Sequence, residues 1–209
     1  MAPDPLVFTD DYLRVRAVPT CHTSTFVWCH SKGQRGGDWK FMVEPLRKLG
    51  HCNHIAFIFP YLDYNETNSE SGISNNEALI QKIVQEEITK GCDPGRIAVG
   101  GYNEGLEVAL RATLADNNKI GGILGITDSL NLTDEVNVLR KTANAKTPVL
   151  FVDRMRTKGT GSEKLKAIEQ PVTVVDGSKL VSSDTQPVTQ EELERLDVFI
   201  HETLPVEMA

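Results

Sequence analysis

The chain has 209 residues and a formal net charge of −7, from 22 basic and 29 acidic side chains. This length is typical of one domain, and a hydrophobic content of 40% is enough for a substantial core. The acidic balance disfavours electrostatic binding of nucleic acid or of an anionic membrane surface. No apolar stretch approaches the roughly 18 residues that a membrane span requires.

The first five residues lack the basic and apolar regions of a secretory signal. The four cysteines, Cys21, Cys29, Cys52 and Cys92, are too sparse for a disulfide scaffold in a chain of this length. We therefore expect a reduced, cytoplasmic protein with a single domain over residues 1–209. Residues 1–22 are expected to form an N-terminal strand or tail, and residues 23–205 the core.

Short apolar runs rich in β-branched residues alternate with helical patterns along most of the chain. The runs predict strands at Thr25–Cys29, His54–Pro60, Arg96–Gly100, Ile120–Ile126, Pro148–Val152 and Pro171–Val175. The helical patterns lie at Lys40–Leu49, Ser74–Lys90, Glu104–Ala115, Gly161–Ile168 and Thr189–Leu204, and capping boxes begin two of them, Ser74 with Glu77 and Thr189 with Glu192. This alternation predicts an α/β fold with a doubly wound, mostly parallel sheet and helices on both faces.

Two loops follow buried strands and are candidates for a binding site. The first runs from His30 to Asp38 and contains three glycines, and the second, from Tyr61 to Gly72, is polar. In open α/β sheets ligands bind outside the carboxyl ends of the strands. Both loops are therefore expected at one rim of the sheet.

The segment Gly101-Tyr102-Asn103-Glu104-Gly105 lies between a predicted strand and a predicted helix. This is the layout of a nucleophile elbow, Gly-x-Ser-x-Gly, in which a strained turn raises one side chain above the sheet edge. Asn103 stands where the serine would be. Because asparagine tolerates a positive φ better than most residues, we expect the turn to keep its geometry without its nucleophile.

This segment is one of several features by which the chain resembles the acyl-protein thioesterase and small carboxylesterase family of α/β hydrolases. The resemblance extends from about Phe26 to Pro205. Four further matches occur in the family's order: residues 26–33, similar to a strand ending in His-Gly-x-Gly; residues 71–73 before a long helix; residues 93–97 before the elbow; and residues 147–150 with the closing helix that contains residues 190–192. The resemblance implies the single-domain α/β-hydrolase fold.

Carried over residue by residue, the resemblance implies a degenerate catalytic triad. The serine position is Asn103, and the acid corresponds to Asp153, which lies several residues early. The family histidine would fall near Thr185, where this chain has none; its histidines are His22, His30, His51, His54 and His201. A carboxamide is a very poor nucleophile, so ordinary thioesterase activity is not expected.

Other parts of a hydrolase site are expected to remain. The resemblance implies an oxyanion hole made by the backbone N–H groups of Lys32 and Glu104, and a structural role for His30. The candidate catalytic residues are Asn103, Glu104 and Asp153. Asn103 would hold a carbonyl, and Glu104, Lys32 or Asp153 would transfer protons if burial moves their pKa values toward neutrality. The candidate substrate-binding residues are His30, Ser31, Lys32, Gly33, Tyr61, Tyr102 and Thr185.

Two of these residues also have purely structural explanations. Glu104 also suits the first turn of a helix, where the dipole favours a carboxylate, and Lys32 suits a solvated loop. Adjacent Cys-His pairs do not have the spacing of a zinc site, so no metal is expected, and no cofactor either.

The leading functional hypothesis is a repurposed non-hydrolytic enzyme that carries out isomerisation, cyclisation or a lyase reaction on a small organic molecule. One alternative is a catalytically dead relative that binds a ligand or a protein partner, and another is a residual esterase. The expected partners are a small-molecule ligand or substrate and, from the family, a second copy in a weak homodimer.

Overall fold

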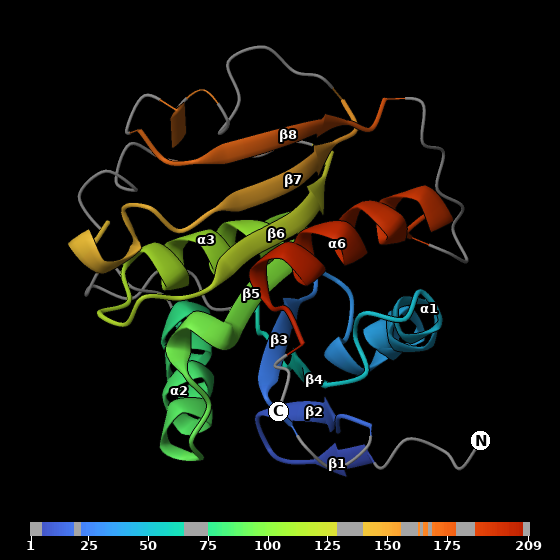
Figure 1. The fold of residues 1–209 in the computed structure, drawn as a ribbon, viewed down its shortest axis with the longest axis vertical. Coiled ribbons are helices and arrows are strands. Elements are labelled where there is room, and N and C mark those ends of the chain that lie inside the picture. Colours follow the sequence, from blue (N-terminus) through green and yellow to red (C-terminus); the bar gives the residue numbers. More distant parts are fainter. Residues whose placement is uncertain are drawn as a thin grey trace.

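The computed structural model describes residues 6–18, 22–64, 75–128, 140–155, 163, 165–166, 169–178 and 187–206. Its centre is an eight-stranded sheet with the strand order β1-β2-β4-β3-β5-β6-β7-β8 (Figure 1). The strands are β1 (Leu6–Phe8), β2 (Tyr12–Val15), β3 (Ser24–Cys29), β4 (Ile55–Pro60), β5 (Ile97–Tyr102), β6 (Gly122–Thr127), β7 (Val149–Asp153) and β8 (Val172–Asp176).

The six strands predicted from apolar runs all form, each within two residues of its expected ends, and they pair in parallel. In the region expected to form an N-terminal strand or tail, β1 and β2 form a hairpin, and β2 also pairs antiparallel with β4. These two strands are too short for periodicity to reveal both. Thr9 helps to make the turn between them, because its hydroxyl accepts the backbone N–H groups of Asp11 and Tyr12.

Among the described residues, four α-helices pack on the sheet: α1 (Val43–Lys48), α2 (Asn75–Thr89), α3 (Glu104–Leu114) and α6 (Gln190–Thr203). The capping box of α6 forms as predicted, with Thr189 and Glu192 bonding each other's backbone. The other predicted box begins at Ser74, outside the described residues. Within the predicted helix at 161–168 only residues 163, 165 and 166 are described, and they are helical.

The first predicted helix is divided into a 3-10 helix, η1 (Gly36–Met42), and the short α1. The chain enters η1 very close to the end of β4. A Cβ on Gly36 would lie 2.3 Å from the carbonyl oxygen of Pro60, so only glycine fits there. The prediction of a single helix over Lys40–Leu49 is wrong at its start, because the residues up to Met42 belong to the 3-10 helix.

Helices cover both faces of the sheet, which confirms the doubly wound arrangement (Figure 1). Trp28 and Phe57 pack in the core cluster that includes α1 and α6, whereas their neighbours Val27 and Ile58 pack in the cluster that includes α2 and α3. Strand residues thus point alternately to two apolar layers. Among the described helices, none has the length and apolar character needed to cross a membrane.

Candidate functional site at the carboxyl rim

The elbow forms as the sequence predicts. β5 ends at Tyr102 and α3 begins at Glu104, so Asn103 alone joins them, with φ 46° and ψ −116°. The flanking glycines permit the close passage of strand and helix. A Cβ on Gly101 would lie 2.5 Å from the backbone of Gly105, and one on Gly105 would lie 2.2 Å from the carbonyl oxygen of Cys29.

The Asn103 side chain is held at both ends by Asp128, the residue that follows β6. Its Nδ2 donates to the Asp128 carboxylate at 3.1 Å, and its Oδ1 accepts the Asp128 backbone N–H at 2.8 Å. To hold a substrate carbonyl, as predicted, the Asn103 amide would have to give up its hydrogen bond to the Asp128 carboxylate. Sequence reasoning missed Asp128, although its place directly after a parallel strand marks it as a rim residue.

The Glu104 carboxylate lies against the glycine-containing loop that follows β3. The Ser31 hydroxyl donates a hydrogen bond to it, and the backbone N–H groups of Lys32 and of Glu104 itself also stabilise its negative charge. Partial burial acts to raise the pKa of Glu104, but these hydrogen bonds and the Lys32 ammonium outweigh it and lower the pKa. The condition for proton transfer by Glu104, a pKa moved toward neutrality by burial, is therefore not met.

These contacts also define the state of the predicted oxyanion hole. Its two expected donors, the N–H groups of Lys32 and Glu104, are the backbone groups that stabilise the charge of the Glu104 carboxylate. We call this arrangement the self-occupied hole. A carboxylate bonded in this way is an ionised hydrogen-bond acceptor at neutral pH.

His30 is buried and connects the two rim loops. Its Nδ1 lies 2.9 Å from the carbonyl oxygen of Ser31, and its Nε2 lies 3.1 Å from the backbone nitrogen of Leu62. Because the Leu62 N–H must donate, Nε2 is the acceptor and the proton is on Nδ1. Burial lowers the pKa of His30, so the ring is neutral and fixes the path of both loops.

A cluster centred on Arg154 follows β7 and was not predicted. Its guanidinium donates to both carboxylate oxygens of Glu192 in α6, at 2.6 and 2.7 Å, and to the Tyr102 hydroxyl at 3.0 Å. It also donates to the Pro187 carbonyl at 2.6 Å and lies 3.9 Å from the Asp128 carboxylate. Tyr102, a predicted substrate-binding residue, is thereby part of a structural cluster that joins β5, β7 and α6.

A pocket of about 250 Å³ opens at this rim. Two of the predicted substrate-binding residues, His30 and Tyr61, lie in its wall. The complete lining is His30, Gln34, Arg35, Gly36, Gly37, Asp38, Tyr61 and Leu62. Parts of both rim loops therefore line one pocket.

The remaining predicted site residues are dispersed. Lys32 and Gly33 are exposed in the loop and are outside the lining of this pocket. Asp153 is buried at the end of β7, where its carboxylate accepts the backbone N–H of Met155 at 3.1 Å. Thr185 lies outside the described residues.

Of the cysteines that neighbour a histidine in the sequence, Cys29 and Cys52 are buried, and Cys21 lies outside the described residues. Cys29 lies in β3, where burial strongly raises the pKa of its thiol, and Cys52 donates to the Asp197 carboxylate. Across the described ranges of the chain, no group of three or more His, Cys, Asp or Glu side chains is placed to hold a metal ion.

Comparisons with known proteins agree with this architecture. Residues 57–153 match the model of the phospholipase/carboxylesterase family. An acyl-protein thioesterase 1 from Saccharomyces cerevisiae is 24% identical over 222 aligned residues, covering 92% of this chain and 98% of the relative. The protein of the same name from Emericella nidulans is 23% identical, covering 89% and 92%.

Solved structures show the same fold. SOBER1 of Arabidopsis thaliana superposes with a TM-score of 0.67 at 16% identity, over 87% of this chain and 99% of that one. A phospholipase/carboxylesterase from Dyadobacter fermentans gives 0.67 at 17% identity, over 96% and 98%. The expected α/β-hydrolase fold and the family resemblance are confirmed.

Proposed function

Because this chain carries the α/β-hydrolase fold and is similar to the phospholipase/carboxylesterase family, we propose that it binds a small ester or acyl compound at the rim without hydrolysing it. The self-occupied hole carries this proposal. Its two N–H groups already stabilise the charge of the Glu104 carboxylate, which accepts a hydrogen bond from the Ser31 hydroxyl. A second negative charge developing there would be repelled instead of stabilised.

The elbow supports the same conclusion. A carboxamide cannot be activated by deprotonation near neutral pH, and both polar atoms of the Asn103 amide are engaged by Asp128. The sequence has no histidine near Thr185, where the family base would fall. Nucleophile, base and free oxyanion hole are the three parts of the hydrolytic mechanism, and each is altered here.

The rim pocket is the place we assign to the ligand. Its volume of about 250 Å³ suits a small molecule rather than a long acyl chain. The His30 ring, whose two nitrogens are engaged within the protein, supplies apolar surface, and the Tyr61 side chain, which is 38% exposed, supplies apolar and hydrogen-bonding surface. The names of the relatives, acyl-protein thioesterases, are the reason for choosing an ester or acyl group as the ligand class.

Non-hydrolytic acid–base catalysis is a second proposal, carried by the buried carboxylate of Asp153 at the rim end of β7. Glu104 is a poor general acid for it, because the lowered pKa keeps the carboxylate ionised near pH 7. Isomerisation, cyclisation or lyase chemistry would therefore depend on Asp153 or Lys32. Residual esterase activity, which the names of the relatives suggest, would need a nucleophile other than Asn103.

A cytoplasmic location, a single domain over residues 1–209 and a weak homodimer remain proposals that rest on the sequence and the family resemblance. Sedimentation velocity over a range of protein concentrations tests the dimer directly.

One experiment tests both parts of the main proposal. Methyl butyrate is titrated into ¹⁵N-labelled protein, and the ester's own proton signals are followed in the same sample for a day. We expect amide shift changes confined to the rim pocket, at Gly36, Gly37 and Leu62, while the ester stays intact at the rate of a protein-free sample.

Matched variants separate the outcomes. Tyr61→Ala should weaken the binding, whereas Val174→Ala, which shortens an exposed apolar side chain in β8 at the opposite edge of the sheet, should not. Protein-dependent cleavage of the ester would disprove the non-hydrolytic claim. Intact ester with no shift changes would disprove the ligand-binding claim.

A further inference from the structure

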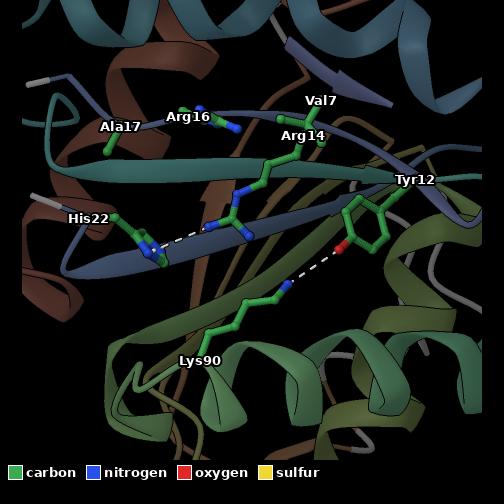
Figure 2. Close-up of a pocket in the computed structure, with 7 residues that line it drawn as sticks. All are labelled: Val7, Tyr12, Arg14, Arg16, Ala17, His22 and Lys90. Carbon is green, nitrogen blue, oxygen red and sulfur yellow. Dashed lines mark hydrogen bonds between the residues drawn. The ribbon is translucent and has the colours of Figure 1, made fainter. Parts of the chain in front are cut away.

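A second pocket, of about 520 Å³, lies away from the rim (Figure 2). It is formed where the β1–β2 hairpin meets the end of α2 and the residues just before β3. Its lining is Val7, Tyr12, Arg14, Arg16, Ala17, His22 and Lys90. The linings of the two pockets share no residue.

A buried carboxylate behind the lining of this pocket holds two of the lining residues in place. The Glu87 side chain in α2 is 0% exposed and accepts hydrogen bonds from Arg14 at 2.5 Å, Lys90 at 2.9 Å and the Thr25 hydroxyl at 2.9 Å. The two cations outweigh the effect of burial and lower the pKa of Glu87. Figure 2 shows Arg14, His22 and Lys90 converging on the same space.

His22 adds hydrogen-bonding capacity without adding charge. Its Nδ1 lies 3.5 Å from Nη2 of Arg14 and its Nε2 lies 2.8 Å from the Thr25 hydroxyl. Arg14 can only donate, so Nδ1 is the acceptor and the proton is on Nε2. Burial and the nearby Arg14 lower the pKa of His22, which keeps the ring neutral.

The charges at this pocket do not cancel. Arg14, Arg16 and Lys90 supply three cations, against the carboxylates of Glu87 and of Glu86, which lies 3.8 Å from Lys90. Within the part of the chain that the structure describes, the Arg16 guanidinium has no ion pair, and its residue is exposed. An excess of one positive charge therefore surrounds a concave site in a protein of net charge −7.

The remaining walls are apolar. Val7 and Ala17 line the pocket together with the ring of Tyr12, whose hydroxyl is held by Glu86 and Lys90. A site with one surplus cation and apolar walls is complementary to a small organic anion. We propose that this pocket binds a monoanionic carboxylate with a short apolar body, its charge facing Arg16, Arg14 and Lys90. This site is separate from the rim pocket and independent of the proposed rim function.

Benzoate and its neutral analogue benzamide test the proposal on the full chain. Each is titrated into ¹⁵N-labelled protein in about 0.1 M sodium chloride, which screens weak surface attraction. We expect benzoate to shift the amides of Tyr12, Arg14 and Lys90, and benzamide to leave them unchanged. Arg16→Gln should weaken benzoate binding about tenfold, as for the loss of a hydrogen bond to a charged group.

Lys146→Gln is the matched control, because it removes an exposed cation near β7, on the other half of the sheet. It should leave benzoate binding unchanged. Equal binding of benzamide, shifts located elsewhere, or equal weakening by the two substitutions would overturn the proposal. No response to benzoate would also overturn it, and would mean that the cations serve only to neutralise Glu87 and Glu86.

Discussion

Asn103 and Asp128 hold each other by two hydrogen bonds, one in each direction, across the carboxyl ends of β5 and β6. The position that would carry a hydrolase nucleophile is therefore a structural link between two strands. A residue at positive φ costs about 1–3 kcal/mol, and two hydrogen bonds of about 0.5–1.5 kcal/mol each offset this strain. Asparagine thus keeps the elbow geometry in place without supplying a reactive group.

Substituting Asn103 tests this link. Asn103→Ala should lower the free energy of unfolding by about 1–3 kcal/mol, because both hydrogen bonds to Asp128 are lost. Asn103→Asp should destabilise through repulsion between two carboxylates, and added salt should recover part of that loss. Urea denaturation at low and high salt measures both effects. An Asn103→Ala variant as stable as the wild type would show that the link contributes nothing.

The Arg154 cluster should be a larger source of stability. The Arg154 and Glu192 side chains are 7% and 0% exposed, so Arg154→Met leaves a buried carboxylate without its partner. Such a loss costs about 3–5 kcal/mol. Arg195→Met removes an exposed pair with Glu191 in the same helix and should cost about 1 kcal/mol or less. Equal effects in urea denaturation would contradict this assignment.

The sequence predicted the layers of this fold well, because buried parallel strands read as continuous apolar runs. β3, β4 and β7 are buried along their whole length, and the sequence placed each within one residue of its ends. The elbow was equally readable, since the approach of Gly105 to Cys29 demands glycine whatever the side chains around it.

The site was harder to predict, since its contacts join distant segments. Nothing local in the sequence shows that Glu104 meets Ser31, that Arg154 meets Glu192, or that Asp128 meets Asn103. The expectation for the pKa of Glu104 considered burial, whereas its partners in the Lys32 loop decide the direction. The pocket around Arg16 was missed because β1 and β2 bring its residues together.

Titration of Glu104 by NMR tests the self-occupied hole. The carboxyl should have a pKa below the usual value of 4.5, because the Ser31 hydroxyl and the Lys32 backbone N–H stabilise its ionised form. Ser31→Ala should raise that pKa, since one donor to the ionised form is lost. Lys48→Ala, beside the exposed Glu44 in α1, is the control and should leave Glu104 unchanged. A pKa of Glu104 above 4.5 would contradict the arrangement.

Stability should fall on mild acidification because of two histidines. His22 and His30 have native pKa values lowered below 6.5, chiefly by burial, so the unfolded chain takes up their protons first. The contribution of these two neutral histidines to the free energy of unfolding is complete above pH 6.5. It declines as the pH falls toward their native pKa values. Glu87 and Glu104, whose pKa values are lowered from 4.5, lose theirs only in more acidic solution.

Denaturation curves at pH 7.5, 6.5 and 5.5 measure this dependence. His30→Gln should reduce the loss between pH 7.5 and 5.5, because one of the two proton-binding groups is removed. A free energy of unfolding that stays constant or increases as the pH falls from 7.5 to 5.5 would contradict neutral, buried imidazoles at both positions.

A fluorophosphonate probe tests most directly whether the rim lacks an activated nucleophile. Wild-type protein and the Asn103→Ser variant are incubated with the probe, and intact masses are compared with those of an active serine esterase treated alongside. We predict no adduct on the wild type, and none on Asn103→Ser because no histidine base accompanies the new hydroxyl. A stoichiometric adduct on any serine of the folded wild-type protein would contradict the account.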